Sequence, residues 1–243
     1  MGQHAKHRPL VRAAVLAGAC LAAGPADACR LALVLAMDVS SSVDAAEDTL
    51  QRGGLAAALI APDVQEAFFA SPDPVALTVF EWSGRYNQED LTDWVLIETP
   101  ADLLRMAETI ATSKRSHNDF PTAMGHALGH AAIRLQDAPD CLFHTIDMAG
   151  DGVNNDGFGP ADAYDAFPFA GVTVNGLVIN AAEFEAETEL IPFYRDHVIR
   201  GPGAFIEIAN GFDDYETAMR RKLIRELAAK VIGQSRLLPE PQG

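Results

Sequence analysis

The 243-residue sequence is poor in basic residues and has no apolar run long enough to cross a membrane. The chain has only 18 Lys and Arg but 34 Asp and Glu, which gives a formal net charge of -16. Because nucleic acids and anionic membrane surfaces attract positive charge, this deficit argues against both as partners. The apolar run at 13–23, AAVLAGACLAA, is far shorter than the roughly 20 residues of a transmembrane helix. We therefore expect no membrane span in the mature chain.

The first 28 residues have the pattern of an export signal. Three basic residues precede the apolar run, and the small-x-small triplet ADA at 26–28 follows it. We expect residues 1–28 to be a signal peptide cleaved before Cys29, which places the mature protein in the periplasm or outside the cell. Removing three basic residues and one acidic residue changes the net charge from -16 to -18. Metal cations and basic surfaces are the better partners for such a chain.

Cysteine is scarce, with only three in the chain. Cys20 lies within the predicted signal peptide, so the mature chain would keep Cys29 and Cys141. Disulfides persist in the oxidising compartments that exported proteins occupy. The sequence therefore predicts a Cys29–Cys141 disulfide.

Short apolar runs alternate with amphipathic stretches from residue 29 onward, without repeats or a long linker, as in a parallel sheet covered by helices. We predict one α/β domain over 29–236 and a loose tail at 237–243. Its sheet would be doubly wound, six-stranded and mostly parallel, with one antiparallel edge strand. The predicted strands are 30–37, 75–82, 94–97, 142–149, 172–179 and 203–208. The predicted helices are 44–60, 101–113, 122–136, 160–168, 187–196 and 213–232.

The antiparallel strand is expected at 94–97. The link SGRYNQEDLTD between 75–82 and 94–97 is too short for a crossover helix, so these two strands should form an edge hairpin. In doubly wound sheets, ligands bind outside the carboxyl ends of the strands. Asp38, at the end of the first strand, would lie there.

Three loops rich in oxygen ligands border the predicted strands and helices. The first is DVSSS at 38–42, the second is NDFPTAMG around Thr122, and the third is AGDGVNND around Asp151. Asp-x-Ser-x-Ser followed by a distant threonine and a distant Asp-Gly resembles the metal-ion-dependent adhesion site of von Willebrand factor type A (vWA) domains. The stretches EWSG at 81–84, AGDGVNN at 149–155 and GPGAF at 201–205 further resemble a bacterial secreted vWA-like family of unknown function. The resemblance covers nearly the whole mature chain.

The resemblance implies a metal site with five side chains. Ser40, Ser42 and Thr122 would supply hydroxyl oxygens to a divalent cation, while Asp38 and Asp151 would orient bound waters and those hydroxyls. Ser41, between the two ligand serines, would point away.

Such a donor set suits Mg²⁺ or Mn²⁺, because Mg²⁺ prefers six oxygen ligands and gives up water reluctantly. Neutral hydroxyl ligands leave the ion much of its positive charge and an open position. A protein partner offering Asp or Glu would fill that position. The arrangement needs no nucleophile or general base, so we expect a binding module rather than an enzyme.

Simpler explanations exist for each loop. Ser40 to Ser42 could cap the helix starting near Asp44, Thr122 could cap the next helix, and Asp151 with Gly152 could form a turn. Two other functions also remain open. One is a metal-dependent phosphate-ester hydrolase with Asp38 as nucleophile, which lacks an evident general acid. The other is a structural domain whose metal site is functionally silent.

Two further groups are ambiguous in the sequence. His126 and His130 are four residues apart on one predicted helix, which is the spacing of some zinc-binding pairs, but a solvated helix face is the better interpretation. Lys114, Arg115 and His117 could form a basic rim beside an acidic partner or simply an exposed, flexible loop.

The vWA resemblance also gives the cysteine pair a place. In that arrangement the first and fourth strands are parallel neighbours in the centre of the sheet. Cys29 lies nine residues before Asp38, and Cys141 lies ten before Asp151. If both aspartates mark one end of the sheet, the two cysteines meet at the other.

Overall fold

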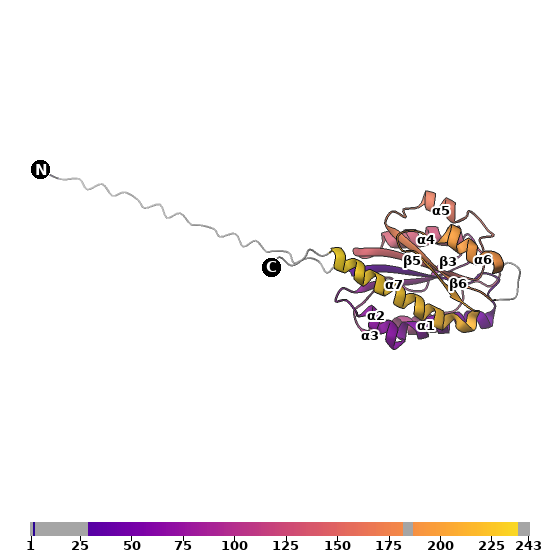
Figure 1. Cartoon of the computed structure of the whole chain (residues 1–243), viewed down its shortest axis with the longest axis horizontal. Helices are drawn as coiled ribbons and strands as arrows, with labels where there is room; N and C mark the ends of the chain where they lie inside the picture. Colours follow the sequence, from indigo (N-terminus) through magenta and orange to yellow (C-terminus); the bar gives the residue numbers. More distant parts are fainter. Residues whose placement is uncertain (1, 3–28, 182–186, 238–243) are drawn as a thin grey trace.

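A computed structural model describes residue 2, residues 29–181 and residues 187–237, which form one sheet covered by helices on both faces (Figure 1). The predicted signal peptide at 1–28 lies outside these residues except for residue 2, and so do residues 238–243 of the predicted tail. The strands are β1 (Cys29–Asp38), β2 (Val75–Trp82), β3 (Gln88–Asp90), β4 (Val95–Ile97), β5 (Cys141–Gly150), β6 (Val172–Ile179) and β7 (Ile206–Ala209).

The sheet is parallel through its centre, in the order β3-β2-β1-β5-β6-β7. Every residue of β1, β2 and β6 is buried, as expected for strands with helices on both faces. Parallel neighbours need crossover connections, and helices supply them between β1 and β2, β5 and β6, and β6 and β7. The fold class predicted from the alternating pattern is confirmed.

The edge beyond β2 carries two short antiparallel strands. β4 pairs with residues 75–77 of β2, as the short link predicts, and β3 pairs with residues 80–82. The sheet therefore has a seventh strand, which the sequence analysis placed in the connecting loop. Gln88–Asp90 is polar and only three residues long, so it carries no apolar alternation to reveal it.

The helices form two layers. In chain order they are α1 (Ala45–Ile60), α2 (Pro62–Phe68), α3 (Pro100–Thr112), α4 (Met124–Gln136), α5 (Pro160–Ala166), α6 (Glu187–Phe193), the π-helix η1 (Tyr194–Val198), the 3-10 helix η2 (Phe212–Asp214) and α7 (Tyr215–Leu237). Helices α1, α2, α3 and α7 lie on one side of the sheet, and α4, α5 and α6 lie on the other (Figure 1). No helix in the described ranges is long and apolar enough to cross a membrane.

Some predicted boundaries differ from the observed ones. The last strand is 206–209 rather than 203–208, because residues 201–203 form a turn with Gly201 and Gly203 at positive φ. The helix predicted over 187–196 ends its α-helical part at Phe193 and continues as η1. Helix α2 was not predicted; Pro62 at its first position starts a new helix after Ile60.

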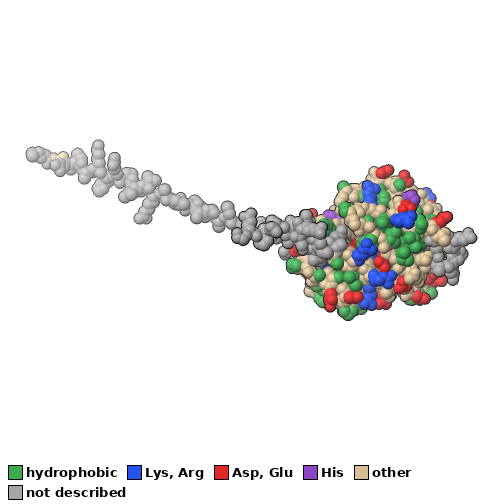
Figure 2. All heavy atoms as spheres, in the orientation of Figure 1, with side chains coloured by type: hydrophobic (Ala, Val, Ile, Leu, Met, Phe, Trp, Pro, Cys, Tyr) green, Lys and Arg blue, Asp and Glu red, His purple; other side chains and the backbone are tan. Residues whose placement is uncertain are grey.

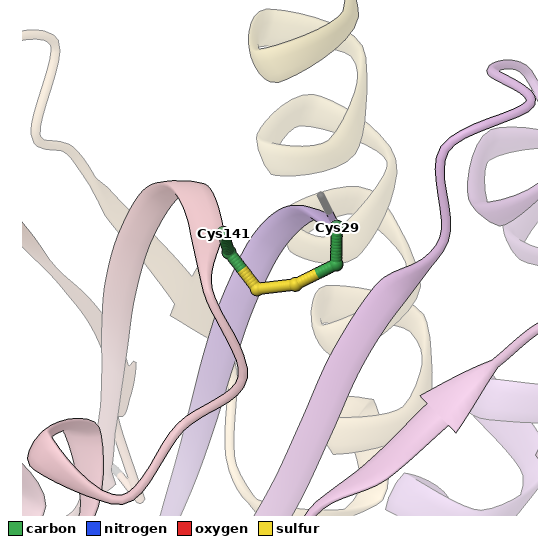
Figure 3. Close-up of a disulfide and its surroundings, with 2 residues drawn as sticks. All are labelled: Cys29 and Cys141. Atoms are coloured by element: carbon green, nitrogen blue, oxygen red, sulfur yellow. A yellow bond between two sulfur atoms is a disulfide. The ribbon is translucent and has the colours of Figure 1, made fainter. Parts of the chain in front are cut away.

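The two cysteines meet as the sequence predicts. Cys29 and Cys141 are register partners on the parallel strands β1 and β5, and they form a disulfide with their Cα atoms 4.4 Å apart (Figure 3). The bond lies at the amino end of the sheet and joins residues 112 positions apart in the chain. It therefore ties the start of β1 to the middle of the sheet.

The surface reflects the acidic composition. Figure 2 shows acidic side chains around the rim of one face, while several Lys and Arg side chains lie over α7. Two arginines of α7 form ion pairs: Arg221 pairs with Glu207, and Arg220 pairs with Asp63. The excess of negative charge is thus left to the rest of the surface.

Candidate metal centre

The three oxygen-rich loops meet at the carboxyl end of the sheet. Asp38 is the last residue of β1, and Asp151 directly follows β5, the strand beside it. Met37 is the register partner of Ala149, so the two aspartates leave the sheet at nearly the same level. Thr122 approaches from the loop before α4 and is buried.

Contacts among side-chain oxygens join four of the five predicted residues. Ser42 Oγ donates to Asp151 Oδ1 at 2.7 Å and lies 3.1 Å from Ser40 Oγ. Thr122 Oγ1 donates to Ser40 Oγ at 3.2 Å. Three hydroxyls from two distant loops therefore converge beside one carboxylate. Ser41, which was expected to point away, is exposed.

Asp38 lies beneath this group and is fully buried. Its Oδ1 accepts a hydrogen bond from the backbone N–H of Ser40 at 2.8 Å, which turns the chain so that the serines face the site. Its Oδ2 has no hydrogen-bond partner among the described residues. A buried carboxylate oxygen without a donor is unusual, and a nearby cation or cation-bound water would satisfy it.

The simple capping explanations fail for two of the loops. Helix α1 is capped by Asp44 itself, whose carboxylate accepts from the N–H groups of Ala46 and Glu47 in a capping box. Helix α4 begins at Met124 after Ala123, and Thr122 does not cap it; the N–H of Gly125 in its first turn donates to Asn154 instead. Ser40, Ser42 and Thr122 are therefore free to face the site rather than a helix end.

The two carboxyl groups are electrostatically strained without a cation. Burial, followed by the charge of Asp151, raises the pKa of Asp38 to about 8. The pKa of Asp151 is also raised, first by burial, although the hydrogen bond from Ser42 opposes this. Both shifts mean that the ionised form lacks enough positive charge nearby. A divalent cation at this place would supply it.

The donor set fits a hard, oxygen-binding cation and not a soft one. Three hydroxyls and two carboxylates carry no nitrogen or sulfur, which suits a divalent cation that accepts oxygen ligands. Consistent with this, no group of three or more His, Cys, Asp or Glu side chains in the described part of the chain could hold a metal. Gly152 leaves room at the site, because a Cβ there would lie only 3.1 Å from Thr122 Oγ1.

The family model described as "Protein of unknown function (DUF1194)" matches residues 28–231. The chain belongs to the DUF1194 family. A comparison with curated proteins gives no match.

Solved structures show which fold the DUF1194 chain has. It is similar to proximal thread matrix protein 1 from the mussel byssus with a zinc-occupied MIDAS motif (17% identity, 83% of this chain, 48% of that chain, TM-score 0.58). It is also similar to a von Willebrand factor type A protein from Catenulispora acidiphila (15% identity, 84% of this chain, 43% of that chain, TM-score 0.56). A third similar structure is the pilus adhesin SpaC from Lactobacillus rhamnosus GG in an open conformation (13% identity, 81% of this chain, 30% of that chain, TM-score 0.56). The fold is that of vWA domains, and this chain spans less than half the length of these three.

The third loop of this DUF1194 protein holds the second loop in place. Asn155 accepts from the N–H of Thr122 at 2.8 Å and donates its own N–H to the Thr122 carbonyl at 2.9 Å. Asn154 accepts from the N–H of Gly125, near the start of α4. The two asparagines of AGDGVNN thus shape the loop and fix the position of Thr122.

Arg115 has a role that the sequence analysis missed. Its guanidinium donates to the carbonyls of Val39, Ser40 and Val43 at 2.6 to 2.9 Å, and to the carbonyl of His117. Arg115 therefore holds the DVSSS loop rather than projecting toward a partner. An arginine in an irregular loop carries no periodic signal, so its partners 72 to 76 residues away could not be found from the sequence.

A buried network supports the Arg115 loop from below. Glu81, of the EWSG stretch, accepts from the N–H of Ser116 at 2.6 Å and pairs with Arg52 on α1. Arg52 also pairs with Asp48 and donates to Ser113 Oγ at 2.7 Å. Helix α1, strand β2 and the loop are thus joined through one arginine.

The two histidines of α4, expected on a solvated face, are half-buried and packed against aromatic rings. His126 stacks on Phe158 with ring centroids 3.9 Å apart, and His130 packs against Phe80 while its Nε2 lies 2.9 Å from Asp90 Oδ1. The sequence alone could not reveal these contacts, because the contacting residues are distant in the chain: Phe158 follows the third loop, Phe80 lies on β2 and Asp90 lies on β3. The two histidines serve packing and share no metal site with each other.

A cleft of about 650 Å³ opens beside the hydroxyl group. Its walls come from the start of α1, the loop after β5 and the loop before α7. The lining includes Ser42, Thr122 and Asp151 together with the apolar side chains of Leu50 and Phe212. The site is therefore open to a group presented from outside.

Proposed function

We propose that this protein is a vWA-type binding module that holds Mg²⁺ or Mn²⁺ and recognises an Asp or Glu side chain on a protein partner. The observation that carries the proposal is the convergence of Ser40, Ser42 and Thr122 with Asp151 above the buried Asp38. The vWA fold supports it, and so does the likeness to a pilus adhesin and to a protein with a zinc-occupied MIDAS motif.

The chemistry explains why an acidic group would be the partner. A cation held mainly by neutral hydroxyls would keep most of its charge, and the cleft lined by Ser42, Thr122 and Asp151 would give an outside ligand access to it. A carboxylate is the hardest anionic ligand that a protein surface offers. We place the protein in the periplasm or outside the cell, which the disulfide supports because such bonds persist in oxidising compartments.

The hydrolase alternative is less well supported by the geometry. A nucleophilic Asp38 would have to reach a substrate phosphorus, but its side chain is fully buried beneath the serines and bound to the Ser40 N–H. The position suits a group that orients the site. A phosphatase assay with Mg²⁺ would separate the two functions.

The metal site is tested by calorimetric titration with Mn²⁺ and Mg²⁺. Thr122→Ala should lower the affinity about 10-fold or more, because one ligand is lost and its neighbours are left without a partner. The matched control is Ser41→Ala, which removes the same kind of hydroxyl from an exposed position in the same loop and should change nothing. Equal affinities for the wild type and Thr122→Ala would refute the site.

The partner half of the proposal needs its own experiment. Immobilised wild-type protein and Thr122→Ala are incubated with native envelope proteins in Mn²⁺ or in chelator. We expect capture only by the wild type with Mn²⁺, and its loss when acidic residues of the captured protein are changed to amides. Metal binding without any chelator-sensitive capture would instead support a structural domain with a silent site.

A further inference from the structure

Two buried oxygens beneath the metal centre lack hydrogen-bond partners among the described residues, and they face the same point. One is Asp38 Oδ2, and the other is the hydroxyl of Tyr194. Tyr194 is the first residue of η1 and has no exposed surface. Its ring belongs to the apolar cluster on the α4 side of the sheet.

Glycines on two neighbouring strands bring the tyrosine to this place. A Cβ at Gly150, the last residue of β5, would lie 2.8 Å from Asp38 Oδ2 and 2.8 Å from the Tyr194 hydroxyl. A Cβ at Gly176 on β6 would lie 2.6 Å from Cδ1 of the same ring. Any other residue at either position would collide with Tyr194. The two glycines thus leave room for the tyrosine ring against the sheet. The two oxygens are close enough for a direct contact or for one bridging water.

We propose that Tyr194 is a positioning residue of the metal centre, whose hydroxyl donates a hydrogen bond to Asp38 Oδ2 directly or through one water. Asp38 would then be held at both oxygens, since Oδ1 already accepts from the Ser40 N–H. A carboxylate fixed in this way keeps the DVSSS loop turned toward the cation. This inference rests on the proposed metal site and adds a residue from a distant segment to it.

The η1 segment suits such a role. Single π-helical turns are rare and occur often at functional sites. Here the turn starts at Tyr194, and its carbonyl accepts from the N–H of Ile199 at 2.9 Å, which closes the turn. Metal occupancy and the position of η1 would therefore be linked through one hydroxyl.

A purely structural tyrosine would behave differently. A buried hydroxyl without a partner destabilises a fold, so replacing it with hydrogen would leave stability unchanged or improve it and would not affect metal binding. A positioning hydroxyl predicts weaker metal binding instead. The two roles therefore predict different metal affinities, and a change in stability alone would not produce that difference.

The test compares Tyr194→Phe with Tyr215→Phe. Tyr215 is the matched control, because it is also fully buried and its hydroxyl also lacks a partner in the described part of the chain, but it lies in the other apolar cluster. Mn²⁺ affinity is measured by calorimetry. We expect about a 10-fold loss for Tyr194→Phe, which is the lower end for losing a group that orients a ligand, and no change for Tyr215→Phe.

A spectroscopic readout accompanies the titration. The sequence has four tyrosines, so protein labelled with ¹³C at the tyrosine Cζ gives four signals, and the two Phe variants assign those of Tyr194 and Tyr215. Adding Mg²⁺ should shift the Tyr194 signal and leave that of Tyr215 in place. Wild-type affinity in Tyr194→Phe, an equal loss in both variants, or an unmoved Tyr194 signal would overturn the inference. A flat titration of the wild type would refute the metal site itself.

Discussion

At the scale of single residues, the candidate metal site combines hydroxyl groups that would each bind a cation only weakly on their own. Ser42 is exposed and Ser40 is buried, yet both hydroxyls and that of Thr122 form one connected group with Asp151. Asp38 lies deeper, where burial and the charge of Asp151 raise its pKa to about 8. If the site holds a cation as proposed, its affinity for the cation should depend on the ionisation of this carboxyl group.

This shift predicts how pH acts on metal binding. The pKa of Asp38 is about 8 in the folded protein without a cation, whereas the ordinary pKa of an Asp side chain is 3.8. The folded state therefore holds this proton more tightly than the unfolded chain, so the unfolding free energy should fall as the pH rises from about 4 to about 8. A cation binds the ionised group and releases the proton. The Mn²⁺ affinity should therefore rise with pH and level off above about pH 8.

Calorimetry across this pH range checks the prediction. Glu226→Gln is the control, because burial raises the pKa of Glu226 to about 8 as well, but Glu226 lies on α7 beside Lys222 and Asn175, so its variant should keep the pH dependence. An affinity that does not change with pH would contradict the ionisation of Asp38 on binding.

At the scale of elements, α7 is held to the sheet by charge as well as by apolar packing. Lys222 on α7 is fully buried and pairs with Asp147 on β5, with Glu226 Oε2 3.8 Å away. Asn175 on β6 donates to Glu226 at 2.6 Å and accepts from the N–H of Phe205 at 3.0 Å. Asp147 is thus a buried partner of α7 and not a metal ligand.

Removing the lysine should destabilise this layer strongly. Lys222→Met leaves Asp147 buried without its counter-charge, which typically costs about 3 to 5 kcal/mol of unfolding free energy. Urea denaturation measures the loss, with Lys114→Met in an exposed loop position as the neutral control. Adding Asp147→Asn to Lys222→Met should recover part of the stability, and a double variant no better than Lys222→Met would contradict the charge explanation.

At the scale of the whole molecule, the Cys29–Cys141 bond and the metal centre lie at opposite ends of β1 and β5. One end of this central strand pair is fixed covalently, and the other end carries the three loops of the candidate site. The pair is buried in the sheet between β2 and β6. The site is therefore built on the most constrained part of the fold.

Loss of the bond should lower stability without altering the site. Cys29→Ala with Cys141→Ala opens a loop of 112 residues, for which chain entropy predicts a loss of about 4 to 5 kcal/mol. Urea denaturation measures it, and the reduced wild type is the control that should match the double variant. Metal affinity measured below the transition should stay at the wild-type value; a large change would mean that the bond shapes the site.

The sequence by itself determined the parallel sheet, the order of its main strands and the three loops at its carboxyl end. Apolar runs and amphipathic stretches are local patterns, so they needed no knowledge of distant partners. The choice of Asp38, Ser40, Ser42, Thr122 and Asp151 within those loops came from the resemblance to vWA domains.

Only the tertiary structure decided what surrounds these residues. Arg115 holds carbonyls of the first loop, Tyr194 passes between two glycines to face Asp38, and Lys222 pairs across the layer with Asp147. None of the three belongs to a motif, because the group that each contacts or faces lies at least 72 residues away, where no local pattern specifies it. Burial makes these contacts strong, and burial is a property of the folded chain alone.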